Sequence, residues 1–95
     1  MIEKYGARFL DRVFTESEIG YAREKRRMEE TLAGRFAAKE AFMKANGTWL
    51  PWKDIEVQRE DGRPFISFRG KLYNGLSISH ERAYAVAVVT IDDKK

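Results

Sequence analysis

The chain has 95 residues, of which 43% are hydrophobic, a composition typical of one small globular domain rather than of a disordered segment. It contains no cysteine, which excludes disulfides, thiolate metal sites and cysteine nucleophiles. The formal net charge of +3 favours anionic partners. No apolar run approaches the length of a membrane span and no signal-peptide core opens the chain, so we expect one soluble, cytoplasmic domain over residues 1–95.

The first half of the chain is predicted to be helical. Residues 8–14 read as a short helix or turn with apolar anchors, and TESE at residues 15–18 has the form of a capping box, which predicts a helix start. The charged residues 23–30 leave open whether this helix breaks. A second helical run is predicted from about Lys25 to Asn46, because Asn46-Gly47 supplies a left-handed stop.

The second half of the chain is predicted to form antiparallel strands. Hydrophobic residues begin to alternate with polar ones, Asp61-Gly62 is a strong hairpin turn, and Asn74-Gly75 marks another turn. The last strand is apolar enough for us to expect burial on both faces. The predicted strands are residues 54–60, 64–68, 76–80 and 84–91. Helices followed by strands predict an α+β fold in which amino-terminal helices pack on an antiparallel sheet.

The helical stretch LAGRFAAKEAFMKANG carries four charges, Arg35, Lys39, Glu40 and Lys44, although it is apolar on nearly every side. Because an unpartnered buried charge is costly, we expect each of the four to meet a partner or a ligand. At 100° per residue the helix has three stripes. The first is small (Gly34, Ala38, Ala41, Ala45), the second is a core stripe (Leu32, Phe36, Met43), and the third carries charge (Ala33, Ala37, Glu40, Lys44).

As a set, the charges Arg35, Glu40 and Lys44 suit a phosphate ligand. Lys44 and Arg35 can pair with phosphate oxygens, and Glu40 can hold a hard divalent cation such as Mg²⁺. A single helix cannot complete such a site, so a second carboxylate is expected from elsewhere in the fold. The alternative is that Glu40 and Lys44 form an ordinary surface ion pair.

His80 is the only histidine, and it ends the predicted strand 76–80. It either faces a cleft or is bonded locally at the strand end. One histidine without cysteine cannot make a zinc site of the usual kind. The chain also has no glycine-rich loop of the Walker type, which argues against a nucleoside triphosphatase.

Five ordered blocks together resemble one known family. They are ARFLDRVFTESEI, GRFAAKEAFMKANG, WKDIEV, DGRPFISFRG and SISHERAYAVAVV, and the resemblance covers Arg8 to Ile91. The chain resembles the holo-acyl-carrier-protein synthases, which are short 4′-phosphopantetheinyl transferases. The resemblance implies magnesium-dependent transfer of the phosphopantetheine arm of coenzyme A to a serine of an acyl carrier protein, with release of 3′,5′-ADP, in fatty acid biosynthesis.

The resemblance also implies roles for individual residues. Glu40 corresponds to a magnesium ligand and Lys44 to the lysine that contacts the phosphates. The implied coenzyme contacts are Arg35, Lys44, Gly47, Arg63, Pro64, Ser79 and His80. The family works as a homotrimer with active sites at subunit interfaces. Since its carrier proteins are acidic, we expect Arg8 and Arg12 to contact the carrier protein.

One departure from the family pattern concerns the metal. The family begins with a strand of the type GIGxDIVEI, whose Asp is the second magnesium carboxylate, and this sequence starts at what looks like the following helix. Met1 therefore resembles an internal methionine, and we expect weak activity from the chain as given and recovery when the strand is restored. Two alternatives stay open: a non-catalytic binder of coenzyme A or phosphate, and a small nucleic-acid binder using Lys25, Arg26 and Arg27. The second lacks any recognisable module, so no nucleic-acid partner is expected.

Overall fold

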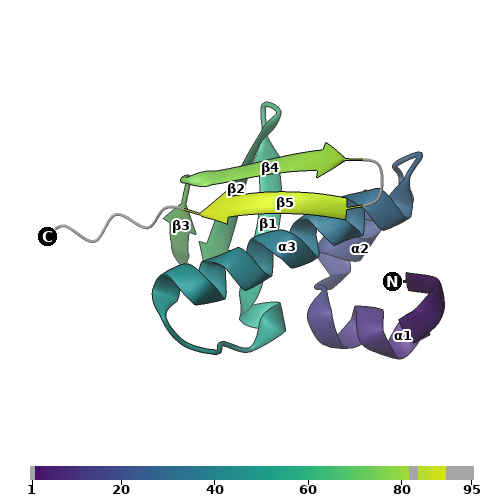
Figure 1. The fold of residues 1–95 in the computed structure, drawn as a ribbon, viewed down its shortest axis with the longest axis horizontal. Helices are drawn as coiled ribbons and strands as arrows, with labels where there is room; N and C mark the ends of the chain where they lie inside the picture. The colour runs from purple at the N-terminus through teal and green to yellow at the C-terminus, as the bar shows by residue number, and fades with distance from the viewer. Residues whose placement is uncertain (1, 82–83, 90–95) are drawn as a thin grey trace, which may run out of the picture.

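The structure of the protein is a computed structural model that describes the backbone of residues 2–81 and 84–89 and the side chains of residues 8–78 and 87–89. In this described part, helices come first and antiparallel strands follow (Figure 1), as predicted. The helices are α1 (Ile2–Val13), α2 (Glu16–Arg23), α3 (Met28–Asn46) and the short 3-10 helix η1 (Trp52–Asp54). The strands are β1 (Ile55–Glu60), β2 (Arg63–Phe68), β3 (Lys71–Tyr73), β4 (Leu76–Glu81) and β5 (Tyr84–Val89).

Local signals set the helix ends. The predicted capping box opens α2: the Glu18 backbone N–H donates to Thr15 Oγ1 at 3.2 Å, and the Thr15 N–H donates to Glu18 Oε1 at 2.9 Å. The charged stretch does break the helical run, because α2 ends at Arg23 and α3 begins at Met28, three residues later than predicted. Gly47 ends α3 in the predicted left-handed conformation, with φ of 83°.

The strands form two sheets rather than the single sheet that the pattern predicted. One sheet has the order β1-β2-β3 and the other is the β4–β5 hairpin. Asp61 and Gly62, with φ of 54° and 79°, make the predicted turn between β1 and β2. Arg69 and Gly70, with φ of 50° and 84°, make a similar turn to β3. That strand was not predicted, because three residues are too few to show alternation.

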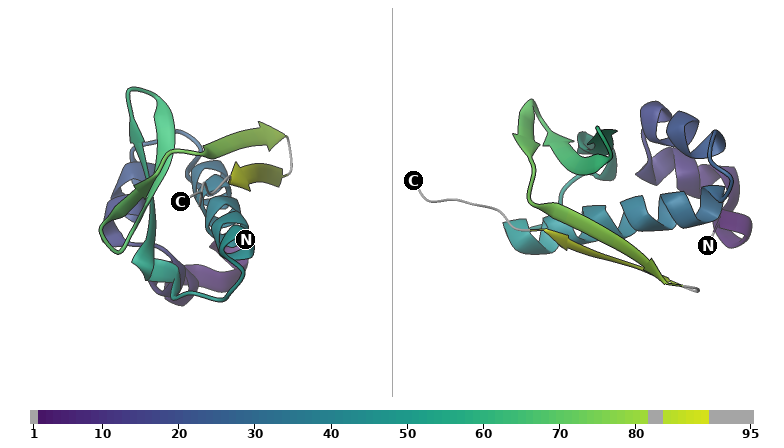
Figure 2. Two further views of the ribbon diagram at one scale, coloured as in Figure 1. Left: turned by 90° about the vertical axis from the view of Figure 1, so that its left-hand side faces the viewer. Right: turned by 90° about the horizontal axis from the view of Figure 1, so that it is seen from above.

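Helix α3 lies between the two sheets (Figure 2), with β5 running along it (Figure 1). Its small residue Ala38 is fully buried. The first core cluster joins α3 to the strands and comprises Ala38, Phe42, Met43, Ile55, Val57, Ile66 and Leu76. The second joins the three helices and comprises Val13, Phe14, Ala22 and Leu32. Within the described residues, no helix is long and apolar enough to span a membrane.

The expectation that the last strand is buried on both faces is wrong for Val88, whose exposed fraction is 58%. The neighbouring residues Ala87 and Val89 pack against the first core cluster. Since successive side chains of a strand point to opposite faces, Val88 points away from α3. Among the described side chains of the β4–β5 hairpin, residues 76–78 and 87–89, those of Ser77 and Val88 are exposed and those that cover the helix are packed against the core.

Candidate functional site

The four charges that follow Leu32 in α3 fall into two groups. Leu32, Arg35, Lys39 and Phe42 follow the spacing i, i+3, i+7, i+10 of one helix stripe, and none of them is more than 3% exposed. Arg35 and Lys39 therefore lie on the buried face, between two core side chains. Glu40 and Lys44, the other two charges, are exposed.

Lys39 finds its partners inside the protein. Its Nζ lies 2.8 Å from Glu18 Oε1 and donates to the backbone carbonyls of Val13 at 2.6 Å and Trp52 at 3.1 Å. The second oxygen of Glu18 accepts the Val57 N–H at 2.6 Å, on the outer edge of β1. Burial lowers the pKa of Lys39 below its usual value, and the Glu18 carboxylate opposes this shift. Of the two possibilities expected for Lys39, a partner or a ligand, the structure shows a partner, because its ammonium is fully used by the fold.

Arg35 is also buried, but one nitrogen of its guanidinium has no hydrogen-bond partner. The guanidinium carbon lies 4.4 Å from the centroid of the Tyr21 ring, and Nε has no hydrogen-bond partner. Arg35 lines a cavity of about 350 Å³ together with Lys25 and Arg59. Burial lowers the pKa of Arg35, while nearby Tyr21 and Glu18 raise it. A cavity lined by three cationic residues is suited to an anion.

Glu40 and Lys44 share a different cavity, of about 360 Å³, at the carboxyl end of α3. Gly47 lines the same cavity, so the structure brings together three residues that the sequence predicted for the site. Among the described residues, the side chains of Glu40 and Lys44 make no hydrogen bond or ion pair, and the alternative of a Glu40–Lys44 surface pair is not formed. Both groups are thus available to a ligand.

Arg35 does not share this cavity in a single chain. It precedes Lys44 by nine residues, which is about 2.5 helical turns, so the two side chains leave α3 on opposite faces. The same spacing separates them by roughly 14 Å along the helix axis. Two cavities, one for an anion and one with Glu40 and Lys44, therefore lie on different sides of one helix.

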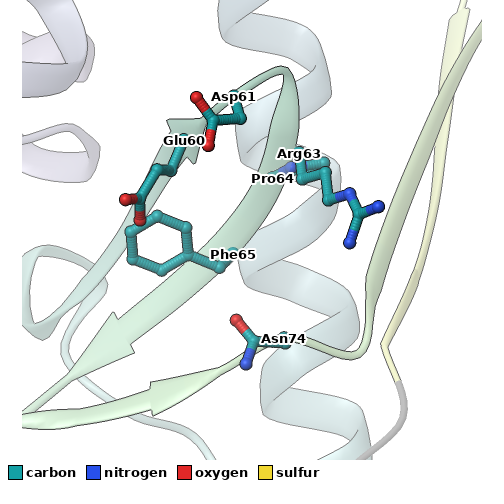
Figure 3. Close-up of a pocket in the computed structure, with 6 residues that line it drawn as sticks. All are labelled: Glu60, Asp61, Arg63, Pro64, Phe65 and Asn74. Atoms are coloured by element: carbon teal, nitrogen blue, oxygen red, sulfur yellow. The ribbon is translucent and has the colours of Figure 1, made fainter.

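Arg63 and Pro64 line a third cavity, of about 540 Å³, at the tip of the β1–β2 hairpin. Figure 3 shows the Arg63 guanidinium on the side of the hairpin opposite to the carboxylates of Glu60 and Asp61. The two predicted coenzyme contacts on this hairpin therefore line a different cavity from Arg35 and Lys44, although Gly62, the residue before Arg63, borders the Arg35 cavity.

Ser79 and His80 belong to β4, where they pair with Val86 and Ala85 of β5. Their side chains lie outside the described residues, so their assignment to the coenzyme stays a prediction.

Sequence reasoning missed Lys25 and Arg59 as neighbours of Arg35 and missed Trp49 beside Glu40 and Lys44. The sequence pattern places Lys25 in a run of charged residues, which suggests only the alternative of nucleic-acid binding. Arg59 lies on an alternating strand, where nothing in the pattern distinguishes it from a solvated side chain. The exposed Trp49 was a usable signal, since a tryptophan beside a helix stop and two site charges has no obvious core role.

The described residues contain no group of three or more acidic or histidine side chains that could hold a metal ion. Glu40 is the only acidic residue among those described around its cavity. Mg²⁺ keeps several waters and usually takes one or two protein carboxylates together with substrate phosphates. The donor set therefore fits an ion that arrives with a phosphate ligand better than a permanent protein-bound ion.

Comparison with known proteins agrees with the resemblance noted in the sequence. A family model described as the 4′-phosphopantetheinyl transferase superfamily matches residues 1–89. The holo-acyl-carrier-protein synthase of Halothermothrix orenii is 43% identical over 94% of this chain and 82% of its own length. The synthase of Koribacter versatilis is 44% identical over 97% of this chain and 86% of its own.

The fold agrees as well. The crystal structure of the holo-acyl-carrier-protein synthase from Neisseria meningitidis matches with a TM-score of 0.79 and 27% identity, over 90% of this chain and 81% of that one. The predicted α+β class is thereby confirmed. With a family match over nearly the whole length and relatives above 40% identity, the chain belongs to the 4′-phosphopantetheinyl transferase superfamily.

Proposed function

We propose that this chain transfers the 4′-phosphopantetheine group of coenzyme A to a serine of an apo-acyl carrier protein, in a magnesium-dependent reaction that serves fatty acid biosynthesis. The observation that carries the proposal is the cavity at the carboxyl end of α3. It holds an unengaged carboxylate and an unengaged ammonium, Glu40 and Lys44, in a chain of this superfamily. Relatives named holo-acyl-carrier-protein synthase support the choice of acceptor.

In this reaction the serine oxygen forms a bond to the β-phosphorus of coenzyme A, and the bond from that phosphorus to the bridging oxygen breaks. The serine loses its proton to solvent water, and 3′,5′-ADP leaves with the electron pair of the broken bond. Lys44 pairs with phosphate oxygens and holds the diester in line with the serine. Glu40 holds the magnesium ion, which supplies charge neutralisation to the pyrophosphate oxygens.

The Arg35 cavity suits the 3′-phosphate of the coenzyme. A phosphate monoester carries up to two negative charges, and the cavity is lined by the cations Lys25, Arg35 and Arg59. Because Arg35 and Lys44 lie on opposite faces of α3, one coenzyme reaches both only if the two side chains come from different copies of the chain. This supports a homotrimer with active sites between subunits.

The acyl carrier protein is proposed to dock at α1. Arg12 lies in the last turn of this helix and Arg8 one turn before it, and both are exposed and open to an acidic partner. Opposite charge steers such an encounter and orients the carrier protein.

The proposal is tested by mass spectrometry of apo-acyl carrier protein incubated with coenzyme A, magnesium and this protein. We expect the mass gain of one phosphopantetheine group, and its loss when magnesium is chelated or in Glu40→Gln. The matched control is Glu29→Gln, which removes an exposed carboxylate in the first turn of the same helix and should retain activity. A mass gain that Glu40→Gln leaves unchanged would contradict the assigned role of Glu40.

A second candidate function is binding of coenzyme A without transfer. It is favoured by the single carboxylate in the Glu40 cavity, since the expected second magnesium ligand is not among the residues described there. Calorimetric titration with coenzyme A beside the transfer assay separates the two functions. Binding without any mass gain of the carrier protein supports the second candidate.

A further inference from the structure

Trp49 is the most exposed of the large hydrophobic side chains that the structure describes, at 79%. Its position is set by the end of α3, where the N–H groups of Gly47 and Thr48 both donate to the Met43 carbonyl, at 2.9 and 3.3 Å. The Trp52 ring lies beneath it, edge to face, with 6.4 Å between centroids. The indole therefore stands on an aromatic support at the end of a capped helix, and it leaves most of its surface uncovered.

The support itself is built into the core. Trp52 stacks on Phe36 of α3 with 5.1 Å between centroids and 15° between ring planes. Its backbone carbonyl accepts a hydrogen bond from the buried Lys39. An exposed tryptophan held against a fixed base presents a large amphipathic surface at low entropic cost.

Trp49 borders the same cavity of about 360 Å³ as Glu40 and Lys44. The described residues give this cavity two chemically different sides. Glu40 and Lys44 supply charge, whereas Met43 and Trp49 supply an apolar wall. A ligand that fits both sides has a charged group joined directly to an uncharged chain.

Coenzyme A has this order of groups, and its placement in this cavity rests on the proposed function. Its reacting β-phosphorus carries the pantetheine arm, an uncharged chain with a dimethyl-substituted carbon and two amides. If that phosphorus lies at Lys44, the arm begins inside the cavity and runs along whichever wall the cavity provides. We propose that Trp49 is the contact for the pantetheine arm and holds it against the Met43 side of the cavity.

The nucleotide end of the coenzyme is the less suitable occupant of this wall. It carries the 3′-phosphate, which requires cations, and Lys44 is the only cation among the described residues of the cavity. The cluster of Lys25, Arg35 and Arg59 lies on another face of α3. The pantetheine arm, which has no charge to neutralise, is therefore the part of the coenzyme that we assign to Trp49.

Fluorescence tests this assignment, because the chain has only two tryptophans. In Trp52→Phe, Trp49 is the sole indole and phenylalanine preserves the ring on which it stands. Coenzyme A and 3′-dephospho-coenzyme A, which both carry the arm, should shift the Trp49 emission to shorter wavelength. The arm-less 3′,5′-ADP should bind without a shift. Trp49→Phe, which leaves Trp52 alone, is the matched control and should respond weakly to all three compounds.

Kinetics give an independent measurement in the otherwise unchanged chain. Trp49→Ala should raise the KM for coenzyme A about tenfold, the effect expected from losing one aromatic contact. Inhibition by 3′,5′-ADP should keep its original constant, because that compound does not touch the indole. A general loss of structure would instead weaken the binding of both coenzyme A and 3′,5′-ADP.

Several results overturn the assignment. An equal shift with 3′,5′-ADP places the nucleotide on Trp49, and a shift caused by apo-acyl carrier protein alone makes Trp49 a protein contact. No shift with coenzyme A, when calorimetry shows binding and the carrier protein gains mass, refutes this inference and leaves the proposed function intact. Absence of both binding and mass gain refutes the proposed function, and this assignment with it.

Discussion

The middle and the carboxyl end of α3 differ in how their charged side chains are used. In the middle of the helix, the ammonium of Lys39 is fully buried and meets a carboxylate and two carbonyls of the same chain. At its carboxyl end, Glu40 and Lys44 stand beside a cavity and contact no opposite charge among the described residues. The stretch of sequence is continuous, yet one charge holds the fold together while its neighbour is left for a ligand.

The difference shows that a charge on an apolar helix is not by itself a sign of a binding site. The two cases differ in whether the charged group has hydrogen-bond partners. The Lys39 ammonium has them, whereas the side chains of Glu40 and Lys44 have none in the described part of the chain. Arg35 lies between these cases, because it is buried like Lys39 but keeps one unsatisfied N–H. Variants of these residues should accordingly separate loss of stability from loss of function.

The largest effect is expected from Lys39→Met. It leaves the buried Glu18 carboxylate without its cation, which should lower the free energy of unfolding by about 3–5 kcal/mol. Urea unfolding followed by circular dichroism measures the change. Lys53→Met, at an exposed lysine, is the control and should stay within about 0.5 kcal/mol of the parent protein. Equal losses in the two variants would show that the buried pair contributes nothing special.

Lys44→Ala should reverse this pattern. Removing a charge that pairs with phosphate should weaken transition-state binding by about 2–4 kcal/mol, which appears as a fall in kcat/KM for coenzyme A. Its free energy of unfolding should change by no more than about 0.5 kcal/mol, because the side chain is exposed. If Lys44→Ala instead loses as much free energy of unfolding as transition-state binding, Lys44 stabilises the fold, as Lys39 does.

Mixing two inactive variants tests whether Arg35 and Lys44 act on one coenzyme from different copies. Arg35→Met and Lys44→Ala each damage every site when alone. In a mixed cyclic oligomer, about a quarter of the interfaces recombine an intact Arg35 with an intact Lys44, and activity should return to that extent. Native mass spectrometry can demonstrate that the subunits have exchanged. If activity then does not recover, both residues serve a site within one chain.

The smallest effect is expected at α1. Reversing Arg8 and Arg12 to Glu should weaken carrier-protein binding about tenfold at low salt, since exposed charges contribute little individually. Coenzyme A binding should be unchanged. Arg23→Glu, on the exposed surface of α2, is the matched control. Unchanged carrier affinity in the double variant, measured by surface plasmon resonance, excludes this docking surface.

Local patterns predicted much of the fold. The capping box at Thr15, the stop at Gly47 and the turn at Asp61-Gly62 each depend on a few neighbouring residues, so the sequence contains the whole cause. The division into two sheets could not be predicted in this way, because it depends on how β4 and β5 pack across α3.

The candidate site was predicted in part for a similar reason. Glu40, Lys44 and Gly47 lie within about two turns of one another on the chain, so helix geometry brings them to one cavity. The pair between Lys39 and Glu18 and the approach of Arg59 to Arg35 join distant segments, and no local pattern announces them. A signal did exist for Lys39, which occupies the stripe between Leu32 and Phe42 and therefore had to be buried.

The carboxylate of Glu18 has a consequence for how the protein opens in solution. It accepts the N–H of Thr15 at the start of α2 and the N–H of Val57 in β1, while it also holds Lys39 of α3. The first turn of α2 cannot unwind without releasing all three. In hydrogen exchange, the amide protons of Thr15 and Val57 should therefore share one opening event, although they are far apart in the sequence. The group that neutralises one buried lysine thus makes the helical layer and the edge of a sheet open as one cooperative unit.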